Sequence, residues 1–328
     1  MPSFFKLDTP AAFKARLWLA LLLVYVVWGT TYFGLSVALR SMPPLFMNTS
    51  RFLAAGLLML ALARWQGAAL PTARQWRNSA LVGGLMGAMA MNLVGFAQKL
   101  GIGSGLMATV VATMPMWLTL WTRVGGEAVR TSSWVALGLG VLGALLLALE
   151  GDFSATWLGA LLAFGAPLCW SLGSYASRKL DLPAGAMAPA AQWLTGGLLG
   201  VLPTLAFEGT APWAQATPSA WAAWAYLLAM GTLVGLNAYL WLLKNASPTL
   251  AGSYSFVNPA VALMVGVWLG NEQLTGWVFA ALPLIGLALA LLLYGPQLGA
   301  AWHRLREAAR AWWTATCARC PDRIKHIS

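Results

Sequence analysis

The sequence predicts an all-α, polytopic membrane protein with ten transmembrane helices arranged as two inverted five-helix repeats. Hydrophobic residues make up 59% of the 328 residues and charged residues only 9%, whereas a soluble domain carries about 25% charged residues. The chain also divides into ten apolar segments, each long enough to cross a bilayer as a helix. Motifs of the first five segments return in the last five, which indicates a duplication.

Clusters of proline, glycine, arginine and glutamate mark the ends of these segments. The first segment follows Lys14 and Arg16 and lacks an A-x-A cleavage site. It is also longer than the apolar core of a signal peptide, so we expect a membrane span that is not cleaved. None of the segments alternates apolar and polar residues as a membrane β-strand does. In chain order, the expected helices are residues 16–39, 43–65, 77–98, 104–123, 132–150, 156–178, 187–207, 220–243, 249–269 and 276–295.

Basic residues predict the orientation of the chain, because short cytoplasmic loops are enriched in Lys and Arg. With both termini in the cytoplasm, 17 of the 20 Lys and Arg residues fall on the inner side. Arg40 and Lys99 fall outside, and Arg51 lies within a span. No loop combines a basic stripe with interleaved aromatic residues. We therefore expect the net charge of +11 to reflect topology and not binding to nucleic acid.

The expected domain organisation follows from these segments. Residues 1–15 form a cytoplasmic N-terminus, residues 16–150 the first repeat and residues 156–295 the second. Residues 296–328 form a cytoplasmic tail in which Trp and Arg recur at helical spacing, as in an amphipathic helix on a membrane surface; a disordered tail is the alternative. The tail holds a Cys-x-x-Cys pair that begins at Cys317, but no second pair follows, so we expect no metal site and no cofactor.

The duplication is visible in matched motifs. The stretch "RFLAAGLL", residues 51–58, aligns with "QWLTGGLL", residues 192–199. Because five is an odd number, the second copy must enter the membrane with the opposite orientation. Inverted repeats of this kind occur in many secondary transporters, where the substrate site lies between the repeats near the bilayer midplane. The other matched pairs are Trp28 with Trp170, Phe33 with Tyr175, Asn92 with Asn237, Phe96 with Trp241, Lys99 with Lys244 and Pro115 with Pro259.

The order of these motifs resembles that of the EamA-type branch of the drug/metabolite transporter superfamily. The shared features are "WG" at Trp28, "SRF" around Arg51, a late proline at Pro115, and "NP" and "GNE" beginning at Asn258 and Gly270. The resemblance covers residues 16–295. It implies a bacterial inner-membrane protein that exports small metabolites, amino acids or drugs through a central cavity between its two halves.

Arg51 is the strongest single candidate for a functional residue. It lies eight residues after Pro43, where the second apolar segment begins, or about 12 Å into the span at about 1.5 Å per residue. An arginine at this depth is costly and usually faces a bundle interior or a wet cavity. Two interpretations stay open: an anchor for a substrate carboxylate or phosphate, and a structural cation bound to helix-end carbonyls or directed outward to the interface.

Further candidates lie at matched depths in the expected spans. A tryptophan in mid-span needs an internal partner or a ligand for its indole N–H, and each matched asparagine is followed one turn later by an aromatic residue on the same face. A proline within a helix can free a backbone carbonyl. Packing between helices is the alternative for all of them. The expected substrate-binding residues are Trp28, Thr31, Tyr32, Arg51, Asn92, Phe96, Met114, Trp170, Ser174, Gln192, Asn237, Trp241, Tyr254 and Asn258, and the expected hinges are Pro115 and Pro259.

Several residue types are absent from the expected spans, and their absence narrows the range of possible functions. No Asp or Glu lies at the middle of a span, no Walker motif is present, and both His residues lie in the tail. We therefore expect no enzyme and no ATPase, and either facilitated diffusion or weak proton coupling. The expected function is alternating-access export of a small-molecule substrate from the cytoplasm by a carrier embedded in the lipid bilayer. A lipid or lipid-carrier translocase is the alternative, and a homodimer is an open option for the assembly.

Overall fold

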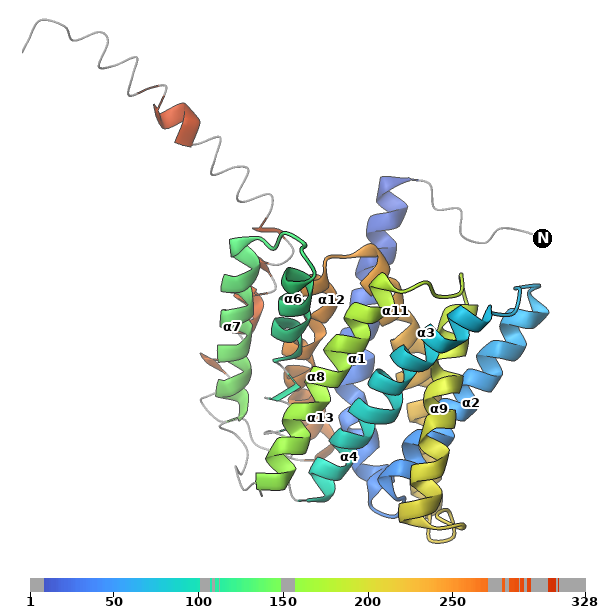
Figure 1. The fold of residues 1–328 in the computed structure, drawn as a ribbon. Coiled ribbons are helices and arrows are strands. Elements are labelled where there is room, and N and C mark those ends of the chain that lie inside the picture. Colours follow the sequence, from blue (N-terminus) through green and yellow to red (C-terminus); the bar gives the residue numbers. More distant parts are fainter. Residues whose placement is uncertain are drawn as a thin grey trace, which may run out of the picture.

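The computed structural model describes residues 9–100, 107, 110–111, 113–148, 157–270 and shorter stretches near the C-terminus, namely 279–280, 283–288, 290–291, 294–295, 306–310 and 312. Over these residues the chain is a bundle of helices without strands (Figure 1). This confirms the predicted all-α class. The "GNE" motif after Gly270, and all but a short helical piece of the predicted tail, lie outside the described residues.

Six helices, or continuous runs of helix, in this part of the chain are long and apolar enough to cross a membrane, as a polytopic membrane protein requires: Pro10–Leu39, Pro44–Trp65, Ala73–Lys99, Trp157–Lys179, Met187–Glu208 and Pro218–Asn245. The elements in chain order are α1 (Pro10–Leu39), α2 (Pro44–Trp65), α3 (Ala73–Gly83), η1 (Gly84–Ala90), α4 (Met91–Lys99), α6 (Met114–Val124), α7 (Thr131–Ala148), α8 (Trp157–Lys179), α9 (Met187–Glu208), α10 (Pro218–Tyr226), η2 (Leu227–Leu236), α11 (Asn237–Asn245), α12 (Pro248–Gly252) and α13 (Tyr254–Gly270).

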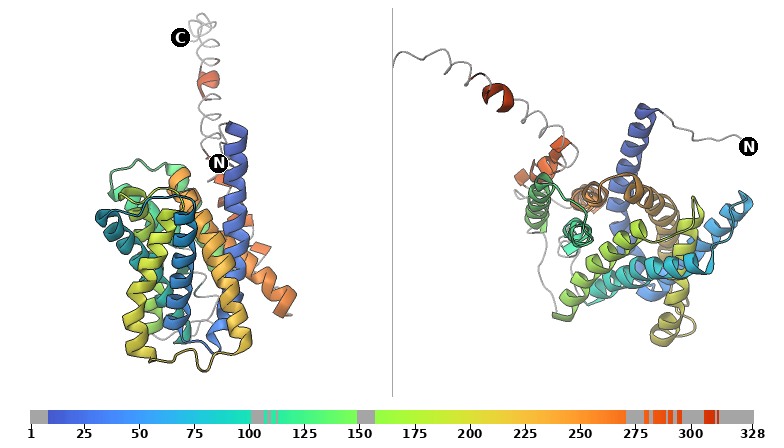
Figure 2. Two further views of the ribbon diagram at one scale, coloured as in Figure 1. Left: turned by 90° about the vertical axis from the view of Figure 1, so that its right-hand side faces the viewer. Right: turned by 45° about the horizontal axis from the view of Figure 1, so that its top comes forward.

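Helix α1 begins at Pro10, six residues before the predicted start at residue 16. The reason is local: Thr9 is the N-cap, its hydroxyl oxygen accepts from the backbone N–H of Ala12 at 3.3 Å, and Pro10 needs no N–H in the first turn. The hydropathy pattern alone missed this cap. At its N-terminal end α1 extends beyond the neighbouring helices (Figure 1, Figure 2).

The third and eighth apolar segments are not uniform α-helices. Each contains a π-helix in its middle, η1 in Gly84–Ala90 and η2 in Leu227–Leu236. In a π-helix the backbone N–H bonds five residues back, which widens the turn and changes the direction of nearby carbonyls, and such segments are frequent at functional sites. The two π-helices lie at corresponding positions of the two halves of the sequence.

Helices α2 and α9 pack side by side along their length (Figure 1). Phe52 stacks on Trp193, with ring centroids 5.5 Å apart and an interplanar angle of 24°. A side chain on Gly56 would collide with the backbone of Leu194, and one on Gly197 would lie 2.7 Å from the backbone nitrogen of Leu53. These contacts are therefore reciprocal between the aligned stretches 51–58 and 192–199.

The first helix of each half packs against helices of the other half. Helix α1 contacts α10, η2, α11 and α13, and helix α8 contacts η1, α4 and α6. The buried aromatic residues of the main core come from both halves, among them Trp28, Phe52, Trp193, Tyr239 and Tyr254. The centre of the bundle is therefore built jointly by the two halves.

Two carboxylates join the halves at the ends of helices. The Glu208 carboxylate, at the end of α9, accepts from the backbone N–H groups of Leu45 at 2.8 Å and Phe46 at 2.6 Å, so it neutralises the positive N-terminal end of α2. Glu127, in the loop after α6, contacts Lys179 Nζ at 2.6 Å and Arg178 Nη2 at 3.7 Å at the end of α8. The hydrogen bond from Lys179, with Arg178 nearby, holds the pKa of Glu127 below its usual value.

Candidate functional site

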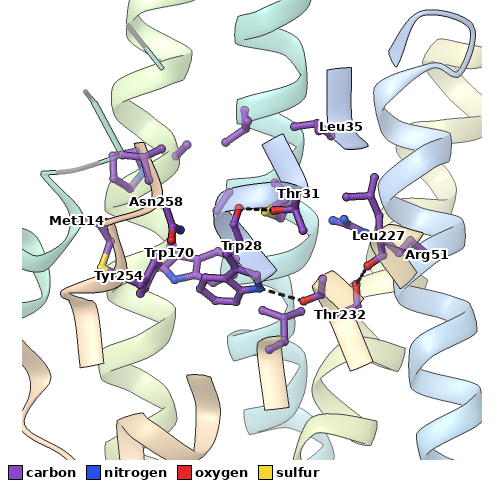
Figure 3. A pocket seen from close by; sticks show the side chains of 18 of the residues that line it. Trp28, Thr31, Leu35, Arg51, Met114, Trp170, Leu227, Thr232, Tyr254 and Asn258 are labelled. Carbon is purple, nitrogen blue, oxygen red and sulfur yellow. Dashed lines mark hydrogen bonds between the residues drawn. The ribbon is translucent and has the colours of Figure 1, made fainter. Parts of the chain in front are cut away.

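A cavity of about 120 Å³ lies in the centre of the bundle (Figure 3). Helices of both halves contribute to its wall, and most of the lining is apolar. The lining residues are Trp28, Thr31, Leu35, Arg51, Phe52, Ala90, Met91, Val94, Val111, Met114, Ala166, Pro167, Trp170, Leu227, Gly231, Thr232, Leu236, Tyr254 and Asn258.

Trp28 forms the aromatic centre of this wall. Its ring meets Trp170 edge to face, with centroids 5.6 Å apart, and Tyr254 in the same way at 4.6 Å. These are the favoured geometries for aromatic pairs. The two tryptophans of the repeated motif thus face each other across the two halves.

The π-helix η2 holds the Trp28 ring in place. The indole Nε1 donates to the carbonyl of Gly231 at 3.0 Å, which satisfies the buried N–H that the sequence left without a known partner. Gly235, one turn later, has no side chain, and a Cβ there would collide with the indole nitrogen. Thr232 in the same segment donates to the carbonyl of Leu227, five residues earlier, at 3.1 Å. The widened turn therefore supplies both the acceptor and the space for the indole.

Arg51 projects from α2 toward the cavity, on the side opposite Met114 and Asn258 (Figure 3). The residue is only 4% exposed. Its Nη2 donates to Asn48 Oδ1 at 2.9 Å, and its guanidinium carbon lies 4.9 Å from the centre of the Phe52 ring. Its Nε has no hydrogen-bond partner. Among the described residues, no carboxylate forms an ion pair with this guanidinium.

Two asparagines fix the orientation of Arg51. Asn48 donates through Nδ2 to Asn92 Oδ1 at 2.9 Å and to the carbonyl of Met91 at 3.1 Å, so its own Oδ1 points to the arginine. Asn92 donates in turn to the carbonyl of Ala88, in η1, at 2.8 Å. The three side chains form one buried polar chain between α2 and the η1–α4 segment. In it Asn92 supports Arg51 and does not line the cavity.

Seven of the predicted substrate-binding residues line the cavity: Trp28, Thr31, Arg51, Met114, Trp170, Tyr254 and Asn258. Their role in binding stays a prediction. Thr31 donates to the carbonyl of Trp28 at 2.7 Å, so its hydroxyl already has one partner.

The other predicted residues lie elsewhere. Ser174 shares a 2.8 Å hydrogen bond with the Tyr239 hydroxyl, and Asn237 donates to the Leu233 carbonyl at 2.6 Å. Gln192 is buried between helices, Phe96 is half-buried on α4, and Trp241 of α11 packs against Phe13 and Arg16, near the N-terminal end of α1. The side chains of Tyr32 and Pro259 lie outside the described residues.

Pro115 occupies a different position from the one expected. We predicted a proline kink inside a helix over residues 104–123, whereas α6 begins at Met114 and Pro115 stands in its first turn. Proline is favoured there because the first turn has no acceptor for its N–H. The hinge role of Pro115 and Pro259 stays a prediction.

Sequence reasoning missed three kinds of contributor to the site. Gly231, Leu227 and Thr232 belong to a π-helix that no residue pattern revealed. Asn48 lies three residues before Arg51, one helical turn away, and this spacing was the available signal. Tyr239 packs 5.2 Å from Trp28 behind the cavity wall, and only the tertiary fold brings it there.

Comparisons with known proteins agree with this architecture. The model of the EamA-like transporter family matches twice, at residues 16–149 and 157–294. The uncharacterized inner membrane transporter YedA of Escherichia coli K12 is 36% identical over 279 residues, which cover 85% of this chain and 91% of YedA. The uncharacterized transporter sll0355 of Synechocystis is 26% identical, over 83% of this chain and 88% of its own length. A solved crystal structure shares the fold, with a TM-score of 0.70 at 21% identity, over 86% of this chain and 97% of that one. The resemblance found in the motifs is thereby confirmed, and the chain belongs to the EamA-like transporter family.

Proposed function

We propose that this protein is an inner-membrane secondary transporter that exports small organic metabolites by alternating access. The observation that carries the proposal is the central cavity, whose wall combines residues of both halves, including Trp28, Trp170 and the buried Arg51. Its volume of about 120 Å³ is below the 300–1,000 Å³ of pockets for drug-sized ligands. This size favours solutes as small as an amino acid over larger drug-like compounds.

Several contacts support an inverted-repeat mechanism. The reciprocal packing of residues 51–58 on 192–199, the exchanged positions of α1 and α8, and the matching π-helices are what two structurally equivalent halves would produce. We propose ten transmembrane helices in two halves that rock against each other around the cavity. The basic loops support a topology with both termini in the cytoplasm.

We also propose that transport is driven by the solute gradient, with at most weak proton coupling. Among the described lining residues of the cavity there is no Asp, Glu or His to carry a proton. A stoichiometric proton flux with the solute in sealed vesicles would contradict this part of the proposal.

The test is counterflow into proteoliposomes with a panel of small amino acids, organic acids and neutral solutes. Leu35 lines the cavity and is 6% exposed, whereas Leu22 on the same helix is 58% exposed. Leu35→Trp should fill the cavity and abolish counterflow, and Leu22→Trp should retain it. Equal transport by both variants would show that the solute does not pass through this cavity. Movement of a labelled phospholipid without any solute transport would instead identify a lipid translocase.

A further inference from the structure

We propose that the cavity selects a small monocarboxylate with an apolar body, and that Arg51 binds its carboxylate. This inference rests on the proposed transport function and names the class of solute. It assigns to Arg51 one of the two roles that the sequence left open.

The first argument is the unbalanced charge of Arg51. A guanidinium has five N–H donors and is always charged, yet the structure gives Nη2 one acceptor and Nε none. A buried cation without a counter-ion is unfavourable in a bundle surrounded by lipid. Among the described residues no ion pair involves Arg51, whereas Arg74, Arg178 and Lys179 each form one elsewhere. An anion in the cavity would satisfy both the charge and the free donor.

The second argument is that the guanidinium is held ready for a ligand. Asn48 fixes one amino group, Asn92 fixes Asn48, and the guanidinium carbon lies over the Phe52 ring. The Nε–H is one of the donors that these contacts leave unused. A carboxylate matches the fork of a guanidinium and accepts from it in the plane. Pre-arranged donors of this kind bind a ligand without a further ordering cost.

The third argument comes from the rest of the wall, which fits an apolar body. Leu35, Val94 and Leu227 contribute aliphatic surface, and Trp28 and Trp170 contribute aromatic surface. The described lining contains no Asp or Glu that could pair with an ammonium group. One arginine balances one negative charge, so a monoanion fits better than a phosphate, and a simple carboxylate fits better than the amino acid with the same side chain.

The experiment compares three probes of similar shape: 4-methylpentanoate, its neutral amide 4-methylpentanamide, and leucine, which adds an ammonium group. Binding to the purified full-length protein is measured by calorimetry, and counterflow in proteoliposomes at pH 8, with protein-free liposomes subtracted. Wild type should bind the carboxylate about tenfold or more tightly than the amide, because the amide lacks the charge-assisted bonds. It should also prefer the carboxylate to leucine.

Three variants distinguish an effect of the Arg51 charge on binding from an effect on folding. Arg51→Gln should bind carboxylate and amide equally, and Arg51→Lys should keep part of the preference because it keeps the charge. The matched control is Arg64→Gln on the same helix, where Arg64 is exposed and donates to the Ala68 carbonyl at 2.7 Å; it should bind as wild type does. Elution of Arg51→Gln as a monodisperse peak, as for wild type, shows that it is folded.

The outcomes separate this inference from the proposed function. An unchanged carboxylate preference in folded Arg51→Gln, or tighter binding of leucine than of 4-methylpentanoate, would overturn the inference. If neutral solutes are transported without any preference for acids, the inference fails while the transport function stands. If the carboxylate binds through Arg51 but no solute shows counterflow, the site stands and the transport function fails.

Discussion

Asn92 and Asn237 occupy matching positions in the two halves, yet their surroundings differ. Each follows a π-helix and donates to the carbonyl four residues earlier, Ala88 at 2.8 Å and Leu233 at 2.6 Å. Asn92 also accepts from the asparagine that holds Arg51. Asn237 instead contacts the Met59 sulfur at 3.4 Å. The same hydrogen bond from an asparagine to the carbonyl four residues earlier therefore occurs in both halves. In one half this asparagine supports Arg51, and in the other it contacts an apolar side chain.

The residues on α2 and α9 show the same contrast. Arg51 aligns with Gln192, and Asn48 aligns with Pro189, which has no polar side chain. Gln192 is 1% exposed, and its Oε1 has no hydrogen-bond partner. The two halves thus share their packing but not their chemistry. A transporter can be nearly symmetric in its scaffold while only one half provides the charge that would select the solute.

The largest expected effect is a loss of stability when the packing of α2 on α9, which the two halves share, is disturbed. Gly56→Val and Gly197→Val should each destabilise the protein by on the order of 3 kcal/mol, because each new side chain meets a backbone at the α2–α9 contact. Thermal unfolding in detergent measures the effect. Gly138→Val on α7 is the control, since open space surrounds Gly138, and it should unfold near the wild-type temperature. A strong effect at Gly56 with none at Gly197 would contradict the reciprocal contact.

The next largest expected effect is a loss of carboxylate binding when the surroundings of Arg51, which the second half does not reproduce, are changed. Asn48→Asp places a carboxylate about where Oδ1 now accepts from Arg51 Nη2 at 2.9 Å, so the protein would supply its own counter-ion. We expect binding of 4-methylpentanoate to fall by about tenfold or more. Because the change also removes the donor that Asn48 gives to Asn92 and Met91, a monodisperse elution peak must show that the variant is folded. Calorimetry measures the loss, and Asn245→Asp at the exposed end of α11 is the control. Undiminished carboxylate binding in Asn48→Asp would show that Arg51 does not bind the anion.

The smallest effect concerns the ion pairs of Glu127, which join the halves at the end of the bundle. Lys179 and Arg178 lower the pKa of this carboxyl in the folded state. The stability that Glu127 contributes is therefore fully present at pH values above the pKa of a glutamate in the unfolded state, which is about 4.3. It is lost as the pH falls through the lower folded value. Glu127→Gln should cost less than about 1 kcal/mol at pH 7, since the pair is partly exposed. Melting curves of both proteins should converge as the pH is lowered to about 3; a constant gap would contradict the assignment.

The sequence was sufficient to predict most of the helices and to identify the central tryptophans as candidates for the site. Hydropathy located most of the helices because a lipid-facing segment must be apolar along its whole length, and the repeat identified Trp28 and Trp170 as a matched pair. The depth of Arg51 identified it as a functional candidate before any contact was known.

Other parts of the site depend on tertiary contacts and backbone detail. A stretch such as "GLMGAMA" is compatible with an α-helix, so nothing in its residues predicted the π-helix η1. Asn92 and Asn237 have the same residue type and spacing, and only their neighbours on α2 decide that one of them supports a cation. Trp241 was expected at the cavity, but it lies ten residues beyond Gly231 on the same continuous run of helix, next to Phe13 and Arg16 near the N-terminal end of α1.

Helix α1 is longer than the hydrocarbon core of a bilayer is thick. Its 30 residues span about 45 Å at about 1.5 Å per residue, whereas the hydrocarbon core of a bilayer is about 30 Å deep. Figure 2 shows the N-terminal turns rising above the bundle. If α1 crosses the bilayer upright, close to three turns at this end would stand in the headgroup layer or beyond it. Helix α1 is joined to one half by the chain and packed on the other. If the halves rotate against each other as proposed, a small rotation would therefore displace the protruding end of α1 by several ångströms, and a spin label there would report the movement.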